Sequence, residues 1–275
     1  MIDLHCHSNF SDGTLSPHDL LHKALDANIR VLALTDHDTV EGLAPLHQAA
    51  LGHPIQIING IEFSTRWKKY DIHILGLDID PMNEHVLALI KQQSESRTLR
   101  AEQIAEKMAS LGVTNAYLRA MEIAGHPRVA RPHFAKLFIE EKMAADMQTA
   151  FKRYLQRGKI AYVATPWISI PEAVAGIVAA KGMAVIAHPL KYQLTRTKLE
   201  KLITEFKEAG GAGMEIVSGE INNLQIQELA ALCEHHQLYA SSGSDYHGET
   251  ISRVSLGRQR QLPLNCMPIW KQWNH

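Results

Sequence analysis

The pattern of apolar and polar positions along the 275-residue chain alternates between two kinds of segment, one typical of strands and one typical of helices. Short continuous apolar runs are typical of parallel strands buried on both faces. Segments with helical periodicity separate these runs, and Ser16 followed by Pro17 suits the cap and first position of one helix. The predicted strands are 2–8, 31–35, 56–63, 71–77, 184–187, 214–217 and 239–242, and the predicted helices are 17–28, 40–51, 170–180, 197–209 and 223–237. This order predicts an α/β fold.

The middle of the chain departs from this alternation. Its periodicity is helical, as in LRAEQIAEKMASLG, and it contains no convincing strand. We therefore expect an α/β barrel domain formed by residues 1–82 and 166–275. A helical insertion, residues 83–165, would interrupt the barrel and cap the active site.

Composition narrows the class of protein. The chain has 45% hydrophobic and 21% charged residues, as in a globular protein with a large core. A formal net charge of −1 argues against a globally basic nucleic-acid surface, while a local basic patch stays open. The chain has no apolar run of about 18 residues and no signal-like start, so we expect neither a membrane span nor a signal peptide. Three distant cysteines without a CxxC spacing predict a reduced cytoplasmic protein. The sequence gives no indication of a protein partner, so none is predicted.

Metal-binding side chains gather where predicted strands end. Residues i and i+2 of a strand point to the same face, so His5 and His7 can chelate one ion. Cys6 between them should point to the opposite face and pack in the core. The other strand ends carry Thr35-Asp36-His37-Asp38, Gly60-Ile61-Glu62 and Asp245-Tyr246-His247, and the single histidines His73 and His188 have a similar placement.

Each of these signals also has an ordinary structural explanation. An HxH pair alone is a weak motif, and His73 alone would more often be a core histidine. Asp36 and Asp38 could form a turn and a helix cap, and Asp12 before a glycine is a turn signal. Buried ionised groups at several strand ends, however, are costly without partners. Because such ends converge at one rim of a barrel, their joint occurrence predicts a metal site.

The same residues resemble a known family. HCH at 5–7, Asp12, TDHD at 35–38, Glu62, His73, AHP at 187–189 and SDYH at 244–247 resemble the polymerase and histidinol phosphatase (PHP) superfamily, a relative of the amidohydrolases. The resemblance implies a distorted seven-stranded (β/α) barrel that holds two or three divalent metal ions per chain.

Carried over by position, the resemblance implies three sets of ligands. They are His5, His7, Glu62 and Asp245 for one ion, Glu62, His73 and His188 for a second, and Asp12, His37 and His247 for a third. Mixed imidazole and carboxylate ligands suit Mn²⁺, our first choice, or Zn²⁺ or Fe²⁺, better than Mg²⁺. Asp12, His37 and His247 are also the candidate catalytic and phosphate-contacting residues. A metal ion that stabilises the leaving oxygen would make a separate general acid unnecessary.

The insertion carries the phrase RPHF at 131–134. Arg131 and His133 beside a helix start could bind an anion, or could simply belong to an ordinary proline-initiated helix. Within the superfamily the phrase resembles the nucleotide-directed branch, which implies that Arg131, Pro132, His133 and Phe134 hold substrate. Lys191 and Tyr192 could also reach the rim.

The resemblance therefore implies a hydrolase acting on phosphoric esters. It would release the 3′-phosphate of nucleoside 3′,5′-bisphosphates to give nucleoside 5′-monophosphates, with 5′-to-3′ exoribonuclease activity on short RNA as a further activity. The expected partner is a small nucleotide substrate or short RNA. The alternatives are a histidinol-phosphate phosphatase and a non-catalytic metal-binding module of the superfamily.

Overall fold

The chain forms two compact units in the computed structural model, which describes residues 1–126 and 128–273. The first unit comprises Met1–Ile90 and Ile168–His275, and the second comprises Lys91–Trp167. The expected boundaries, 82/83 and 165/166, fall a few residues earlier, because helix α3 (Glu84–Ala109) begins in the first unit. Among the described residues, no helix is both long and apolar enough to cross a membrane.

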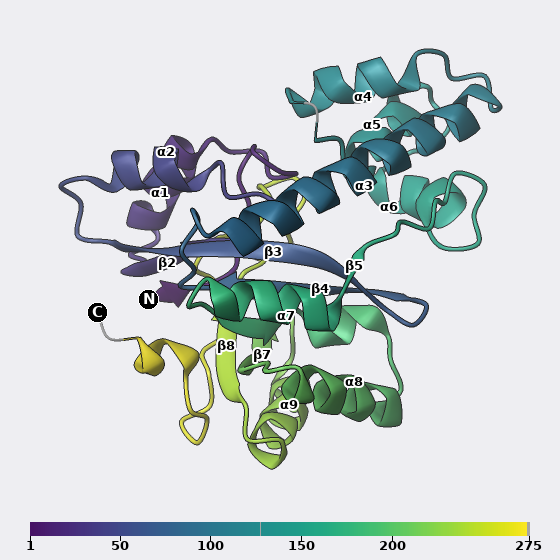
Figure 1. Cartoon of the computed structure of the whole chain (residues 1–275). Coiled ribbons are helices and arrows are strands. Elements are labelled where there is room, and N and C mark those ends of the chain that lie inside the picture. Colours follow the sequence, from purple (N-terminus) through teal and green to yellow (C-terminus); the bar gives the residue numbers. More distant parts are fainter. Residues whose placement is uncertain (127, 274–275) are drawn as a thin grey trace. The chain divides into compact units, whose positions relative to one another are not determined.

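The first unit is built around one mixed sheet (Figure 1). Its strands follow the order β1-β2-β3-β4-β6-β7-β8, and β5 pairs with β3 to one side of this path. The bounds are β1 Ile2–Asp3, β2 Val31–Leu34, β3 Gln56–Trp67, β4 Tyr70–Leu77, β5 Ile168–Ser169, β6 Met183–Ile186, β7 Gly213–Ser218 and β8 Tyr239–Gly243. The expected α/β barrel is confirmed.

The first and last strands of the sheet, β1 and β8, close this barrel. Beyond β1, the amide of Leu4 donates to the carbonyl of Ser242 at 3.1 Å, and the amide of Asp245 donates to the carbonyl of His5 at 2.8 Å. The close approach requires glycine at position 243, since a Cβ atom there would lie 2.3 Å from Cβ of His5. Closure therefore places the first histidine of the chain beside the segment that follows β8.

The hairpin of β3 and β4 is the main distortion of the barrel. The two strands are antiparallel, from Gly60 opposite Leu77 to Trp67 opposite Tyr70. The expected strand end at residue 63 was wrong, because pairing with β4 extends β3 to Trp67. Glu62 therefore lies within β3 and not at its end. The reversed direction of β4 brings its first half to the edge where β2 ends.

Helices cover the outside of this sheet (Figure 1). Ser16 caps the first one as expected, because its Oγ accepts the amide of Asp19 at 3.1 Å. The buried face of α8, which includes Leu202 and Phe206, joins the largest apolar core of the unit. The helices are α1 Pro17–Asp26, α2 Leu43–Ala50, α7 Ile170–Ala179, α8 Arg196–Glu208 and α9 Asn223–His235, with short 3-10 turns at Pro189–Tyr192 and Ile269–Gln272.

Among its described residues the second unit contains helices and connecting loops but no strand, as expected. After α3 it contains α4 Ala116–Ala124, α5 Arg131–Glu140 and α6 Met147–Ala150, which continues into a π-helical turn, Phe151–Leu155. It has an apolar core of its own, in which Phe134 and Phe138 are fully buried and Phe138 stacks on Tyr154 with ring centroids 4.2 Å apart.

Candidate metal centre

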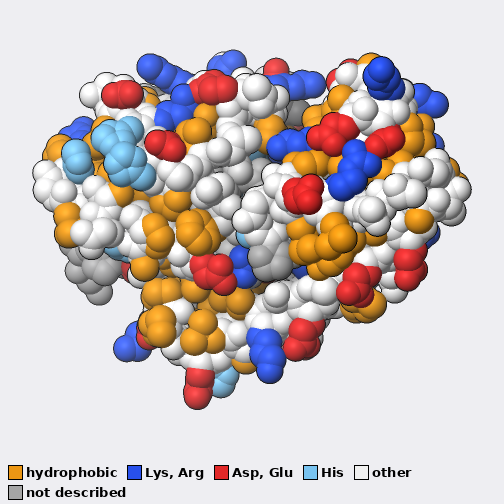
Figure 2. Space-filling model, turned by 90° about the horizontal axis from the view of Figure 1, so that it is seen from above, with side chains coloured by type: hydrophobic (Ala, Val, Ile, Leu, Met, Phe, Trp, Pro, Cys, Tyr) orange, Lys and Arg blue, Asp and Glu red, His pale blue; other side chains and the backbone are white. Residues whose placement is uncertain are grey.

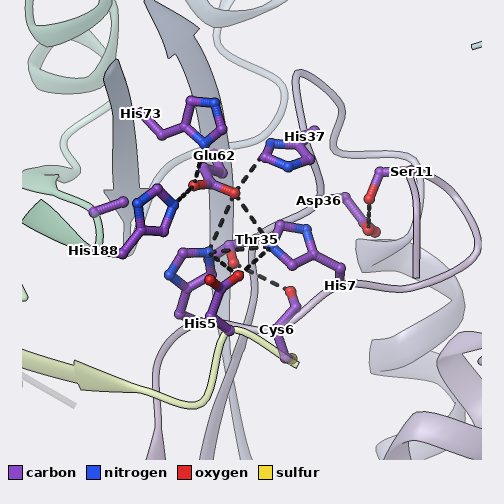
Figure 3. Close-up of polar contacts among 12 residues, drawn as sticks. His5, Cys6, His7, Ser11, Thr35, Asp36, His37, Glu62, His73 and His188 are labelled. Atoms are coloured by element: carbon purple, nitrogen blue, oxygen red, sulfur yellow. Dashed lines mark hydrogen bonds and ion pairs between the residues drawn. The ribbon is translucent and has the colours of Figure 1, made fainter. Parts of the chain in front are cut away.

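Glu62 lies at the centre of the histidine cluster, with both carboxylate oxygens fully buried (Figure 3). Its Oε1 lies 2.9 Å from Nδ1 of His73 and 2.9 Å from Nε2 of His188. Its Oε2 lies 3.2 Å from Nε2 of both His5 and His7. Nδ1 of His37 lies 3.0 Å from the same Oε2. The two oxygens thus face different sets of imidazoles, as those of a carboxylate that bridges two ions would.

A first group of donor atoms surrounds Oε2 of Glu62. The Nε2 atoms of His5 and His7 are 3.1 Å apart, so the two rings share one face as the i, i+2 spacing predicted. Oδ1 of Asp245 lies 3.5 Å from each of these nitrogens. Ligand atoms of a tetrahedral site with bonds of about 2.1 Å lie about 3.4 Å from one another. The spacing therefore fits ligands of one ion.

A second group lies around Asp12, in the loop that precedes α1. Oδ1 of Asp12 is 3.3 Å from Nε2 of His247 and 3.9 Å from Nε2 of His37. His7 belongs to the same group, since one donor atom of each of the four residues lies within 4.8 Å of the others. All nine expected ligands therefore converge. His7 also belongs to the first group. His37 likewise adjoins both groups, because its Nδ1 lies 3.0 Å from Oε2 of Glu62.

The charge balance of the cluster fits a bound cation. Oε2 of Glu62 is buried, and no hydrogen bond from the described residues reaches it, although three imidazole nitrogens lie close by. Burial would raise the pKa of Glu62, but the imidazoles of His37, His5 and His73 outweigh it and hold the pKa well below its usual value. A buried carboxylate that stays ionised needs a positive partner, which is either a protonated imidazole or a metal ion.

The pKa values of Asp12 and His37 also depend on burial and on neighbouring charges. Burial would raise the pKa of Asp12, but His247 and His37 hold it well below its usual value. Burial lowers the pKa of His37 itself far enough to outweigh the carboxylates of Glu62 and Asp12. A lowered pKa favours the neutral ring, which is the form that binds a metal ion.

Two of the expected ligands have strained backbones. His188 follows β6 with a φ of 26°, and Asp245 follows β8 with a φ of 53°. Such conformations persist where surrounding contacts over-determine them, as at functional sites. Here the amide of His188 donates to Oε2 of Glu215 at 2.6 Å, and the amide of Asp245 donates to the carbonyl of His5.

Sequence reasoning missed Glu215, which lies in β7 and is fully buried. Its Oε1 is 3.0 Å from Nδ1 of His5, while its Oε2 accepts the amide of His188. One carboxylate thus positions two expected ligands. The available signal was a lone acidic residue within the apolar run GMEIV.

Asp36 also has a positioning role that the sequence left open. Its carboxylate accepts the amide and hydroxyl of Ser8, at 2.8 and 2.6 Å, and the hydroxyl of Ser11 at 2.6 Å. These bonds fix the loop that carries Asp12. Cys6 packs in the core as expected, and its Sγ donates to the carbonyl of Ala33.

Lys191 and Tyr192 lie beside the cluster. The ammonium of Lys191 forms an ion pair with the carboxylate of Asp245. Burial would lower the pKa of Lys191, but Asp245 outweighs it and raises the pKa above its usual value. The hydroxyl of Tyr192 accepts the amide of His73 at 2.8 Å and donates to the carbonyl of Ala187 at 2.9 Å, which ties β4 to the end of β6.

The RPHF phrase begins α5 in the second unit. Arg131 and Pro132 are the first two residues of the helix, and Nδ1 of His133 accepts the amide of Ala130 at 2.9 Å. Arg131 is half-buried. Phe134, which was expected to contact substrate, is fully buried in the apolar core of this unit.

The fold and the cluster define an α/β-barrel protein with a site for divalent metal ions. Residues 3–216 match the PHP domain family. The chain belongs to this family, as its resemblance to the superfamily implied.

Named relatives match nearly the whole chain. It is 40% identical over 272 residues to the 3′,5′-nucleoside bisphosphate phosphatase of Chromobacterium violaceum, covering 98% of this chain and 95% of that protein. It is 37% identical over 273 residues to the 5′-3′ exoribonuclease Rnm of Escherichia coli, covering 98% and 93%.

Solved structures agree with these matches. An amidohydrolase from Chromobacterium violaceum, with bound sulfate and no metal, superimposes with a TM-score of 0.93 at 40% identity, covering 98% of this chain and 95% of that one. A structure from Bifidobacterium adolescentis shares the fold, with a TM-score of 0.80 at 24% identity and coverage of 98% and 93%.

Proposed function

We propose that this protein is a metal-dependent phosphatase that removes the 3′-phosphate of nucleoside 3′,5′-bisphosphates and yields nucleoside 5′-monophosphates. The observation that carries the proposal is the position of Glu62, whose two oxygens face different sets of imidazoles. Relatives named as a phosphatase and as exoribonucleases, all hydrolases of phosphoric esters, support the same reaction class.

In this proposal, nine residues hold two or three ions. The ligands are His5, His7, Glu62 and Asp245 for the first ion, Glu62, His73 and His188 for the second, and Asp12, His37 and His247 for the third. The donor set of imidazoles and carboxylates favours Mn²⁺, with Zn²⁺ or Fe²⁺ as alternatives. When bound, such ions acidify water and neutralise phosphate charge.

The residues around Asp12 form the part of the site that would receive the 3′-phosphate. His37 and His247 adjoin Asp12, and both side chains are only partly buried. They are therefore accessible to a ligand, whereas His5 and His7 are fully buried. We assign Asp12, His37 and His247 to contact with the reacting phosphate.

The second unit would supply the specificity. Arg131 is the first residue of α5, where backbone amides and the helix dipole favour an anion. His133, whose ring is fixed by the amide of Ala130, lies on the same turn. We propose that Arg131, with Pro132 and His133, holds the 5′-phosphate, and that this unit caps the active site during turnover.

The same arrangement accounts for a further activity on short RNA. An exoribonuclease that starts at a 5′-phosphate must also hold that phosphate while it cuts the neighbouring 3′ ester. Relatives from Haemophilus influenzae and Escherichia coli carry the name 5′-3′ exoribonuclease. A free bisphosphate and an RNA 5′ end would then be two substrates of one site.

The test is a substrate panel with the purified chain and Mn²⁺. It contains adenosine 3′,5′-bisphosphate, adenosine 3′-monophosphate, histidinol phosphate and a short 5′-phosphorylated RNA. We expect phosphate release from the bisphosphate, with adenosine 5′-monophosphate as the product, and none after removal of the metal. Hydrolysis of histidinol phosphate alone would refute the proposal in favour of its enzymatic alternative.

A further inference from the structure

Two exposed histidines on α1 lie one helical turn apart. The Nε2 atoms of His18 and His22 are 3.2 Å from each other. Their ring centroids are 4.5 Å apart, and the ring planes meet at 63°. Figure 2 shows histidine side chains gathered on the surface over the region of α1 and α2.

The geometry of this pair closely matches that of His5 and His7. In that buried pair the Nε2 atoms are 3.1 Å apart, and the ring centroids are 5.1 Å apart at 59°. The spacing of His18 and His22 also fits an edge of a tetrahedral metal site, about 3.4 Å. On a helix, the i, i+4 spacing places two imidazoles on one face, where they can chelate a single ion.

A third histidine stands beside the pair. His53 follows α2, and its exposed ring lies 6.3 Å from the ring of His22, between centroids. The packing of α1 against α2 brings the two elements together through Leu20, Leu21 and Leu46. The amide of His53 donates to the carbonyl of Ala50 at 3.0 Å, which fixes the turn that carries the ring.

Charges around the pair also suit a cation. The carboxylate of Asp19 lies 3.7 Å from Nδ1 of His18, and both side chains are exposed. Lys23, the cation next to His22 in sequence, forms an ion pair with Glu249. A negative group therefore adjoins the imidazoles, and the neighbouring positive charge is compensated.

We propose that His18 and His22 bind one divalent transition-metal ion, such as Zn²⁺ or Ni²⁺, at a surface site separate from the cluster around Glu62. Water would complete the coordination, and the nearby His53, whose ring centroid lies 6.3 Å from that of His22, is not required as a ligand. Imidazole ligands select such ions over Mg²⁺ or Ca²⁺. This site uses no residue of the proposed active centre.

The experiment compares the full chain with two double variants. His18→Asn/His22→Asn removes the chelate, whereas His235→Asn/His236→Asn removes two histidines that are adjacent in sequence at the end of α9 and serves as the matched control. Each protein is dialysed against zinc and its bound zinc is counted by mass spectrometry. Retention of untagged protein on a Ni²⁺-charged resin gives a second readout.

We expect His18→Asn/His22→Asn to hold one zinc ion fewer per chain and to elute earlier from the resin, while the control matches the original chain. Because His18 and His22 are exposed, His18→Asn/His22→Asn should keep the original hydrolysis rate and thermal midpoint. Equal zinc content and equal retention in all three proteins would overturn the proposal.

Discussion

Oε1 of Glu215 lies 3.0 Å from Nδ1 of His5, so that the Nε2 atom of the same ring is the one that faces His7, Glu62 and Asp245. A carboxylate can only accept a hydrogen bond, so it places the proton of the neutral ring on Nδ1. The lone pair on Nε2 is then free for a metal ion. Glu215 thus selects the tautomer that a ligand requires.

Glu215→Gln is expected to weaken metal binding roughly 10–100-fold. An amide offers one acceptor, yet both His5 Nδ1–H and the amide of His188 need one. If the NH₂ group faces His5, it favours the wrong tautomer; if it faces His188, two donors oppose each other. Metal titration followed by mass spectrometry measures the affinity. Glu220→Gln, which changes an exposed partner of Arg253, should leave it unaltered.

Glu62→Gln should have a larger effect, because it removes the charge that faces both sets of imidazoles. We expect the rate of phosphate release to fall roughly 100-fold or more. Even residues that only support a metal ligand change metal affinity or activity about 10–100-fold. Metal content should fall by more than one ion per chain. Glu62→Asp keeps the charge and should retain more metal. Full metal content in the glutamine variant would contradict a bridging role.

If Arg131 holds the 5′-phosphate, Arg131→Ala should lower kcat/KM for adenosine 3′,5′-bisphosphate roughly 30-fold or more. This factor corresponds to a loss of about 2–5 kcal/mol of binding free energy in the transition state. Adenosine 3′-monophosphate lacks that phosphate, so its hydrolysis should not change. Arg153→Ala, on an exposed position of the same unit, is the matched control. Equal losses for both substrates would point to a structural role for Arg131 instead.

The stability of the metal-free protein should depend on pH through His7. Burial would lower the pKa of His7, but the carboxylates of Asp245 and Glu62 raise it from 6.5 to about 9. Because the folded pKa is the higher one, this stabilisation is present below pH 6.5 and is lost as the pH rises through about 9.

The thermal midpoint of the metal-free protein should therefore fall between pH 6.5 and pH 9. Scanning fluorimetry across this range measures it, and His7→Gln should flatten the slope. Saturation with Mn²⁺ should remove or reverse the dependence, since metal ions compete with protons for the ring. A midpoint of the metal-free protein that rises across the range would contradict the assignment.

Local patterns made much of the site predictable. Strand alternation placed His5 and His7 on one face, and Ser16 marked the start of α1. Long-range pairing was not predictable in the same way. Glu215 reaches His5 across 210 residues, and no local periodicity marks such a partner.

The remaining differences arise from tertiary context. β5 has only two residues, which is too short for a recognisable strand pattern in the sequence. It is a strand because it pairs with β3. The extension of β3 to Trp67 likewise depends on the antiparallel β4 beside it. Phe134 adjoins two polar residues in a phrase that suggested binding, yet its own apolar ring is used to fill the core of the second unit.

The closure of the barrel by Leu4 and Ser242 has a consequence for biosynthesis. His5 precedes β2 along the chain, whereas Asp245, which would share its ion, follows β8, the last strand of the sheet, and is therefore synthesised much later. A nascent chain cannot complete this centre, however much metal is present, until almost all of the barrel has been made. Metal binding would then act late in folding, and it would stabilise the closed barrel, in which the segments after β1 and β8 meet, over partly folded chains.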